Sequence, residues 1–179
     1  MRGMANYMKA YLRVKRQTLD VDYHDLARQI WGIDRRQFTV HHYGNDDSLN
    51  NRLHLTFWLD PTEFTQAFTN TRPRWLVCPI QLTTVEPAAH LVMVRTNYLN
   101  ELPMTQKAFY NLVYYLSEAL GGRLSIDGQR TWVHANDLYL DKYQIMDKDF
   151  YDCLAASAQL AKTRTVNPVL HDYHLKDVG

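Results

Sequence analysis

The residues with the clearest chemical potential are two histidines, His41 and His54, with Tyr43 and Arg52 beside them. They lie in two segments that alternate between polar and apolar residues, as strands do, joined by the turn-forming loop 44–51. If the loop closes symmetrically, Tyr43 faces Arg52. His41 then faces His54 on the same polar face, with about 5 Å between their Cβ atoms. Two imidazoles at that distance can share a metal ion or shuttle a proton.

This register also sorts the second face of the hairpin by polarity. Its pairs are Phe38 with Phe57, Val40 with Leu55, and His42 with Leu53. A slip by one residue in a single strand would mix polar and apolar residues on each face. We therefore predict an antiparallel pair in which Tyr43 is opposite Arg52.

A zinc ion normally takes at least three protein ligands. Nothing in the sequence places a third ligand beside His41 and His54. We expect a polar sheet face with neutral histidines, and we predict no metal and no cofactor. The alternative is a small metal-dependent or histidine-based hydrolase that uses the cross-strand pair.

No motif of a known catalytic machinery occurs in the sequence. It has no glycine-rich phosphate loop, no nucleophile elbow and no zincin helix. Cys78 and Cys153 are far apart and lie in apolar or helical patterns, so we expect buried, reduced thiols. These features favour a domain that is not an enzyme, although active sites also assemble from distant residues.

Basic residues gather near the start of the chain. Residues 7–15 alternate, which predicts a strand with one apolar face and one face that carries Tyr7, Lys9, Tyr11, Arg13 and Lys15. Arg16, Arg35 and Arg36 add to the cluster. Such a face suits phosphates and stacked bases. It also suits a solvated edge strand whose charges discourage aggregation, which we expect.

The clearest helix covers residues 105–120 and ends at Gly121-Gly122. Its helical spacing predicts that an apolar stripe is buried against a sheet: Phe109, Leu112, Val113, Leu116 and Leu120. Tyr110 and Tyr114 lie one turn apart, off this stripe. Exposed tyrosines favour interfaces, so this pair is a candidate contact surface, and packing under a neighbouring element is the equal alternative.

Other helices have recognisable start and stop signals. Asp22 predicts the N-cap of a helix that ends at Gly32, and Asp60-Pro61 predicts the start of another. A short helix is expected near residues 136–143. Asp147 predicts the N-cap of a last helix.

Two further strand pairs are expected. One lies at residues 75–84 and 90–97, and the other flanks Asp127-Gly128, a dipeptide typical of a two-residue hairpin turn. Together, the elements predict an α+β fold. Its antiparallel or mixed sheet has about five to seven strands, and the long helix packs on one face. We expect one domain over residues 1–162 and an extended arm or tail over 163–179.

The order helix, Gly-Gly, short hairpin, short helix between Phe109 and Tyr143 is similar in layout to a unit of several small bacterial α+β binding domains. The FtsZ-binding domain of the cell-division protein ZipA has this layout. The resemblance covers about 35 residues and is carried chiefly by Gly121-Gly122. It implies a protein-binding domain and assigns no residue a role.

The 179 residues carry 20 lysines and arginines against 19 acidic residues, a net charge of +1. This balance does not point to nucleic acid or an anionic membrane as partner. No stretch approaches the roughly 18 apolar residues of a membrane span, and no signal peptide is visible. We therefore expect a cytoplasmic, non-catalytic domain that binds an unknown protein or a second copy of itself. Nucleic-acid binding through the N-terminal strand is the second alternative, after the hydrolase.

Overall fold

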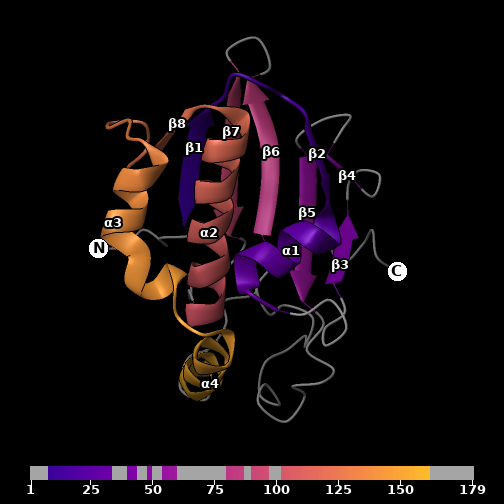
Figure 1. Ribbon diagram of the computed structural model, residues 1–179, viewed down its shortest axis with the longest axis vertical. Helices are drawn as coiled ribbons and strands as arrows, with labels where there is room; N and C mark the ends of the chain where they lie inside the picture. Colours follow the sequence, from indigo (N-terminus) through magenta and orange to yellow (C-terminus); the bar gives the residue numbers. More distant parts are fainter. Residues whose placement is uncertain are drawn as a thin grey trace, which may run out of the picture.

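The computed structural model describes residues 8–33, 40–43, 48–49, 54–59, 80–86, 90–96 and 102–161. Four helices and an antiparallel sheet form a mixed α and β fold in this part of the chain (Figure 1). The strands are β1 (Lys9–Arg13), β2 (Leu19–Asp22), β3 (Val40–Tyr43), β4 (Ser48–Leu49), β5 (His54–Leu59), β6 (Ile80–Glu86), β7 (Leu91–Thr96) and β8 (Arg123–Ser125). The helices are α1 (Tyr23–Trp31), α2 (Pro103–Leu120), α3 (Ala135–Met146) and α4 (Phe150–Ala161).

Neighbouring strands of the main sheet follow the order β3-β5-β6-β7-β1-β8, and each neighbouring pair is antiparallel. The expected combination of helices with an antiparallel sheet is confirmed. A separate short pair joins β2 to β4. The sequence contains no signal for this pair, because Ser48 and Leu49 lie in a loop that is otherwise rich in turn formers.

β1 places its apolar residues on one face of the sheet, as its alternation predicts. Ala10 and Leu12 have no exposed surface, whereas Arg13 is exposed. In the neighbouring β7, Val94 and Val92 are also fully buried and lie opposite Ala10 and Leu12. The inner face of β1 and β7 is therefore a continuous apolar surface.

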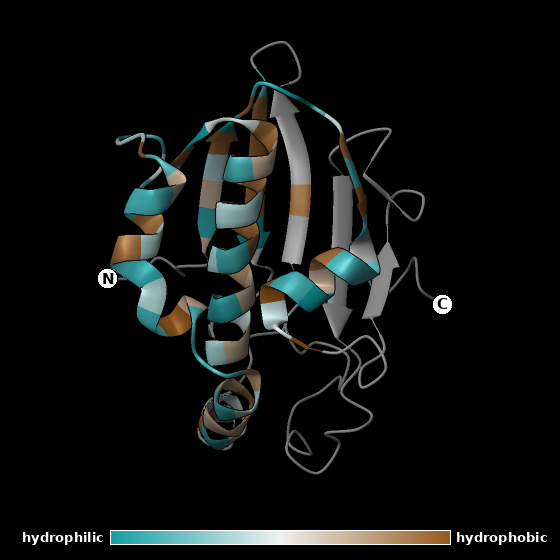
Figure 2. Cartoon of the chain, in the orientation of Figure 1, coloured by the Kyte–Doolittle hydropathy of each residue, from teal (hydrophilic) through white to brown (hydrophobic). Residues whose placement is uncertain are grey.

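Helix α2 covers this apolar surface (Figure 1). The predicted stripe is confirmed, because four of its residues have no exposed surface: Leu112, Val113, Leu116 and Leu120. Figure 2 shows polar residues along the side of α2 that is turned away from the sheet. The Met104 N–H in the first turn donates to Ser157 Oγ of α4 at 3.0 Å, which satisfies a group that the helix itself leaves unpaired.

Helix α1 begins and ends where the sequence predicts. Asp22 accepts hydrogen bonds from the N–H groups of His24 and Asp25 at 2.8 and 3.3 Å, and Gly32 has a left-handed backbone with φ of 70°. The indole of Trp31, which is fully buried, donates to the Met104 carbonyl at 3.2 Å. This bond fixes α1 against the start of α2.

The predicted cap of the last helix is wrong. Asp147 follows the end of α3, and its N–H donates to the Tyr143 carbonyl at 2.8 Å. The carboxylate of Asp149 accepts from the N–H groups of Tyr151 and Asp152 at 2.8 and 3.2 Å, so Asp149 caps α4. Aspartate is a preferred N-cap residue at either position. Because α3 extends to Met146, Asp147 belongs to the end of α3, and Asp149 is left to cap α4.

The two-residue turn predicted at Asp127-Gly128 is also wrong. The bridge after β8 joins Leu124 to Val133, which makes the connection longer. Gly128 and Gln129 both have positive φ, of 76° and 70°. The turn chemistry of the dipeptide is real, but it shapes the inside of a longer loop.

Several sequence predictions lie outside the described residues. These are the helix that starts at Asp60-Pro61, the surroundings of Cys78, and the arm over residues 163–179.

Candidate functional site

The predicted register of the first hairpin is wrong. The backbone pairs Tyr43 with Thr56 and His41 with Trp58, whereas the prediction pairs Tyr43 with Arg52. The shift is four residues, the difference between positions 56 and 52.

Position 54 therefore lies four residues along β5 from the partner of His41, which is position 58. Strands rise about 3.3 Å per residue, so His41 and His54 sit at positions roughly 13 Å apart. His54 pairs across the sheet with Thr83 of β6 instead. The directly opposed histidine pair, on which the hydrolase alternative depends, is absent from the backbone pairing.

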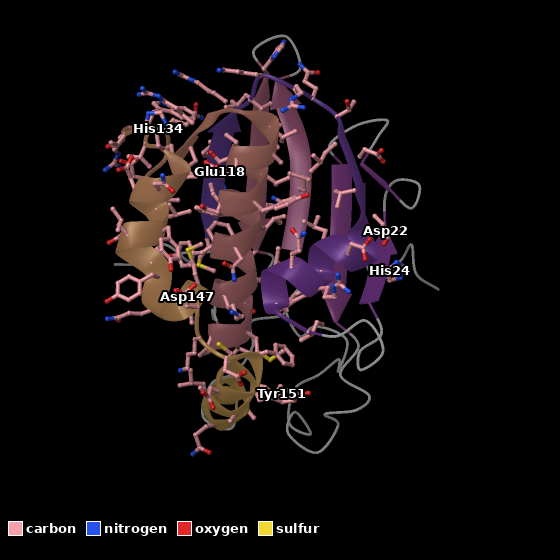
Figure 3. All side chains as sticks on the ribbon, in the orientation of Figure 1. Asp22, His24, Glu118, His134, Asp147 and Tyr151 are labelled. Carbon is pink, nitrogen blue, oxygen red and sulfur yellow. The ribbon has the colours of Figure 1, made fainter. Side chains whose placement is uncertain are left out.

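The candidate polar face of His41, His54 and Tyr43 stays a prediction, and Arg52 lies outside the described residues. Within the described part of the chain, no group of three or more His, Cys, Asp or Glu side chains is arranged to hold a metal ion. Figure 3 shows titratable side chains on separate elements, with Asp22 and His24 at α1 and Glu118 on α2.

Tyr110 and Tyr114 of α2 lie under α3. Both are half-buried and pack against the hydrophobic core. The Tyr114 ring lies 6.1 Å from the Tyr139 ring of α3, and Lys142 of α3 lies over the Tyr110 ring at 5.4 Å. In this structure both tyrosines help to join α2 to α3, and their predicted role at an interface with another protein stays a prediction.

The outer face of α3 carries exposed apolar side chains. Tyr139 is 36%, Leu140 72% and Tyr143 48% exposed. At 100° per residue, Tyr143 lies between the other two, so the three form one side of the helix. Leu138 lies on the far side of the helix and is buried, and Ala135, one turn before Tyr139, is buried at the edge of this side. We call Tyr139, Leu140 and Tyr143 the α3 patch.

The α3 patch has a defined arrangement. The Tyr139 hydroxyl donates to the Asp147 carboxylate at 2.6 Å, and this hydrogen bond raises the pKa of Tyr139 above its ordinary value of 10.0. The rings of Tyr139 and Tyr143 lie 6.4 Å apart at 53°. Because Tyr139 also contacts Tyr114, the patch rests on the core. Its signal in the sequence is the helical spacing of Tyr139, Leu140 and Tyr143, which puts the three on one side of the helix.

A buried lysine holds the end of α3. Lys107 of α2 is only 6% exposed, and its Nζ donates to the Met146 carbonyl at 2.6 Å. Asn111 donates to the same oxygen at 3.1 Å and to the Ile30 carbonyl at 3.0 Å. Met146 is the last residue of α3, where carbonyl groups lack partners within the helix. Lys107 and Asn111 supply those partners.

Burial lowers the pKa of Lys107, while nearby Cys153, Asp147 and Asp149 act in the opposite direction. The thiol of Cys153 is free and fully buried, as the sequence predicts, and burial raises its pKa. A thiol with a raised pKa is a poor nucleophile at neutral pH. Lys107 and Cys153 therefore have the features of structural residues, not of catalytic ones.

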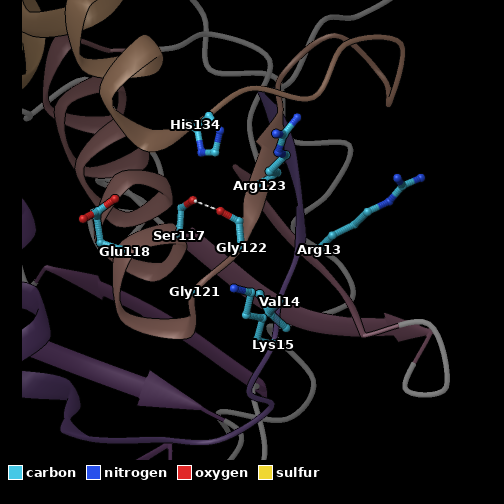
Figure 4. A pocket seen from close by; sticks show the side chains of 9 residues that line it. All are labelled: Arg13, Val14, Lys15, Ser117, Glu118, Gly121, Gly122, Arg123 and His134. Atoms are coloured by element: carbon cyan, nitrogen blue, oxygen red, sulfur yellow. Dashed lines mark hydrogen bonds between the residues drawn. The ribbon is translucent and has the colours of Figure 1, made fainter.

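A cleft of about 520 Å³ lies where β1 and α2 end and where β8 and α3 begin (Figure 4). Its walls are Arg13, Val14, Lys15, Ser117, Glu118, Gly121, Gly122, Arg123 and His134. The Ser117 hydroxyl donates to the Gly122 carbonyl at 3.1 Å, so it serves the end of α2. The cleft is predominantly cationic, and it holds neither of the two histidines that the sequence singles out.

Comparison of the chain with family models, curated proteins and solved structures gives no match. The layout shared with small bacterial binding domains therefore remains a resemblance. Among the described residues, no helix is long and apolar enough to cross a membrane.

Proposed function

We propose that this chain is a non-catalytic cytoplasmic domain that binds another protein or a second copy of itself. Its framework is an antiparallel sheet of five to seven strands, and its contact surface is the α3 patch. The exposure of Leu140, at 72% of its surface, is the observation that carries the proposal. A leucine that lies beside two exposed tyrosines on one helix face is costly in water and gains most when a partner covers it.

The composition of the patch supports a protein as the partner. Tyrosine is enriched at the centres of protein interfaces, where it buries a large area and keeps its hydroxyl hydrogen-bonded. Tyr139 already meets this condition through Asp147. A stable interface buries roughly 800 Å² on each partner, so the α3 patch would be its centre and neighbouring polar residues its rim.

The test uses Leu140→Arg and Tyr143→Ala in the full chain, with Tyr151→Ala of α4 as the control. Tyr151 is a matched side chain, because it is also a helical tyrosine and is 52% exposed. We expect both α3 variants to melt like the parent and to lose association. Association is measured as self-association by sedimentation and as affinity capture with identification of the bound protein.

The Tyr151→Ala variant should keep both forms of association. If the parent sediments as a monomer and all three variants capture the same proteins as the parent, the α3 patch is not a binding surface and the proposal fails.

A further inference from the structure

We propose that the outer face of β7, β1 and β8 is a binding site for single-stranded nucleic acid. This inference goes beyond the proposed function, because the site lies on the opposite side of the sheet from the described helices. We call the face defined by Lys9, Tyr11, Arg13, Met93, Arg95 and Arg123 the outer sheet face.

The outer sheet face follows from the register. Lys9, Tyr11 and Arg13 alternate with the buried residues of β1, so they point away from α2. Tyr11 is paired with Met93 of β7 on one side and with Ser125 of β8 on the other. The described helices pack on the inner face, and Figure 1 shows α2 on that side of the sheet.

Like charges lie directly opposite one another at both ends of this face. Lys9 is paired with Arg95, and Arg13 is paired with Arg123. Opposed like charges destabilise a sheet, and an anionic ligand between them reverses the sign of that contribution. Lys9 and Arg95 make other interactions as well, so the stronger evidence is the row of Arg13 and Arg123, which are both exposed.

An aromatic ring lies between the two cationic rows. Tyr11 is two residues from Lys9 and two from Arg13, or roughly 6.6 Å from each along the strand. A second ring, Trp132, packs against Arg13, whose guanidinium lies 4.1 Å from the ring centroid. Cations interleaved with aromatic rings are the arrangement that binds the backbone and the bases of a single strand together.

The positive charge is local, although the chain is nearly neutral. Residues 8–19 contain four cations, Lys9, Arg13, Lys15 and Arg16, and no acid. Residues 135–161, which form α3 and α4, contain five aspartates and two lysines. A nucleic-acid single strand, which is anionic, is therefore attracted to the β1 side of the molecule and repelled by the α3–α4 side. The cationic cleft continues the face, because Arg13 and Arg123 belong to both.

The residues of the face favour a single strand of nucleic acid over a duplex. A duplex is read mainly by a helix or a ribbon that enters the major groove, whereas a sheet face that carries a half-exposed tyrosine, Tyr11, between cations offers stacking to unpaired bases. An acidic protein would satisfy the cations but would make no use of stacking on Tyr11. The ligand we infer is a single strand without a specific sequence.

The test measures the binding of a labelled oligothymidylate or oligouridylate of about 12 nucleotides, a length within the roughly 4–16 nucleotides that one OB fold, a common single-strand-binding domain, covers. We expect the full chain to bind it with an affinity that falls as salt rises from about 50 to 200 mM. Arg13→Ala with Arg123→Ala removes two phosphate contacts and should reduce the slope of log affinity against log salt by about 1.4. Tyr11→Leu should weaken binding by roughly 5- to 150-fold, the contribution of one stacked base.

The matched control is Arg28→Ala with Lys148→Ala. It removes the same number of cations from exposed positions on α1 and after α3, and it should leave the affinity unchanged. Leu140→Arg, which disrupts the α3 patch, should also bind the oligonucleotide. That result would separate this site from the proposed protein-binding surface.

Photocrosslinking of a bromouridine oligonucleotide to the parent protein does not depend on the folding of any variant. It should label peptides that contain Tyr11 or Trp132. The proposal is overturned if the parent does not bind, if the control double variant weakens binding as much as the Arg13 and Arg123 variant, or if crosslinks fall on other segments. Equal binding of polyglutamate would indicate an acidic protein as ligand, and equal binding of a duplex would exclude the stacking mechanism.

Discussion

Gly122 lies directly against the backbone of Arg13, so that a Cβ atom at position 122 would overlap the Arg13 carbonyl oxygen. This approach brings β1 to the turn between α2 and β8, where the N–H groups of Lys15 and Arg16 donate to the Leu120 carbonyl at 3.0 and 3.3 Å. The preceding residue, Gly121, ends α2 with a left-handed φ of 68°. The two glycines thus have different roles: Gly121 supplies a left-handed backbone conformation, and Gly122 leaves room for the Arg13 backbone.

Gly122→Ala should destabilise the protein by about 1–3 kcal/mol or more, because backbone atoms must move to admit the methyl group. Denaturant unfolding measures this loss. Gly128→Ala is the comparison, since position 128 has a φ of 76° in open space and pays only the roughly 1–2 kcal/mol of left-handed strain. Hydrogen exchange at the amides of Lys15 and Arg16 should increase in Gly122→Ala alone. Unchanged exchange there would show that the close approach does not hold β1 in place.

Leu116→Ala should cost about 2–5 kcal/mol, the usual range for a fully buried leucine. Thermal melts should show a lower transition temperature. Leu140→Ala, at an exposed position on α3, should melt close to the parent, since it removes little buried surface. If both variants melt alike, α2 does not pack on the sheet through this stripe.

Tyr114→Ala should also destabilise the protein, because it loses the partly buried area of Tyr114 and the ring contact with Tyr139. The ring contact alone should contribute about 0.5–1.5 kcal/mol. From the sequence alone, Tyr114 as a pure interface residue would have no effect on stability. A double-mutant cycle with Tyr139→Ala isolates the ring contact. A coupling energy of zero would mean that α3 does not rest on Tyr114.

The hairpin of β3 and β5 shows where sequence reasoning succeeds and where it stops. The polar and apolar alternation predicts both strands and their antiparallel pairing, which the structure has. The true register differs from the predicted one by four residues, an even number, so it sorts the faces of the two strands in the same way. Polarity alone therefore cannot separate the two registers, and the candidate histidine site depended on that choice.

The exposure of side chains on a helix can likewise be predicted only in part from the sequence. The spacing of α2 correctly predicts its buried stripe, because one helix face alone must meet the sheet. It also places Tyr110 and Tyr114 off that stripe, but their exposure depends on α3, a separate element. The opposed cations Arg13 and Arg123 belong to strands far apart in the sequence, so only the pairing of β1 with β8 brings them together.

The loop after β8 depends on the carboxylate of Asp127. One oxygen of this carboxylate accepts from the Ser125 hydroxyl at 2.7 Å and from the N–H groups of Arg130 and Thr131 at 3.0 and 2.9 Å. These hydrogen bonds, first of all those with Thr131, hold the pKa of Asp127 well below its ordinary value of 3.8. A lowered carboxyl pKa contributes stability above pH 3.8, and that contribution is lost as the pH falls through the lowered pKa.

We therefore expect the Asp127 carboxyl, followed by NMR, to stay ionised when the pH falls below 3.8. The Thr131 amide resonance should shift only when Asp127 finally takes up a proton. In Asp127→Asn, the Thr131 amide should lose its acid-dependent shift and gain hydrogen exchange. Titration of Asp127 at its ordinary pKa would contradict the three hydrogen bonds.

Lys107 should make the free energy of unfolding increase with pH in the alkaline range. Its pKa is lowered by burial, so the unfolded chain binds a proton more readily than the native protein does between the lowered pKa and the ordinary 10.5. In that window the unfolded state carries more bound protons, and the free energy of unfolding from this group rises with pH. Cys153 acts in the opposite direction, because its raised pKa makes the native protein hold a proton that the unfolded chain releases above pH 9.0.

Variants separate the two groups. The free energy of unfolding of the parent minus that of Lys107→Met should increase with pH as the pH approaches 10.5, since the variant lacks the titrating amine. The same difference against Cys153→Ala should decrease above pH 9.0. Urea unfolding at a series of pH values measures both differences. A difference against Lys107→Met that does not change with pH would contradict this prediction. The desolvation cost of the charged Lys107 would then be fully offset by its hydrogen bond to the Met146 carbonyl, and the amine would act only as a partner for the C-terminal end of α3.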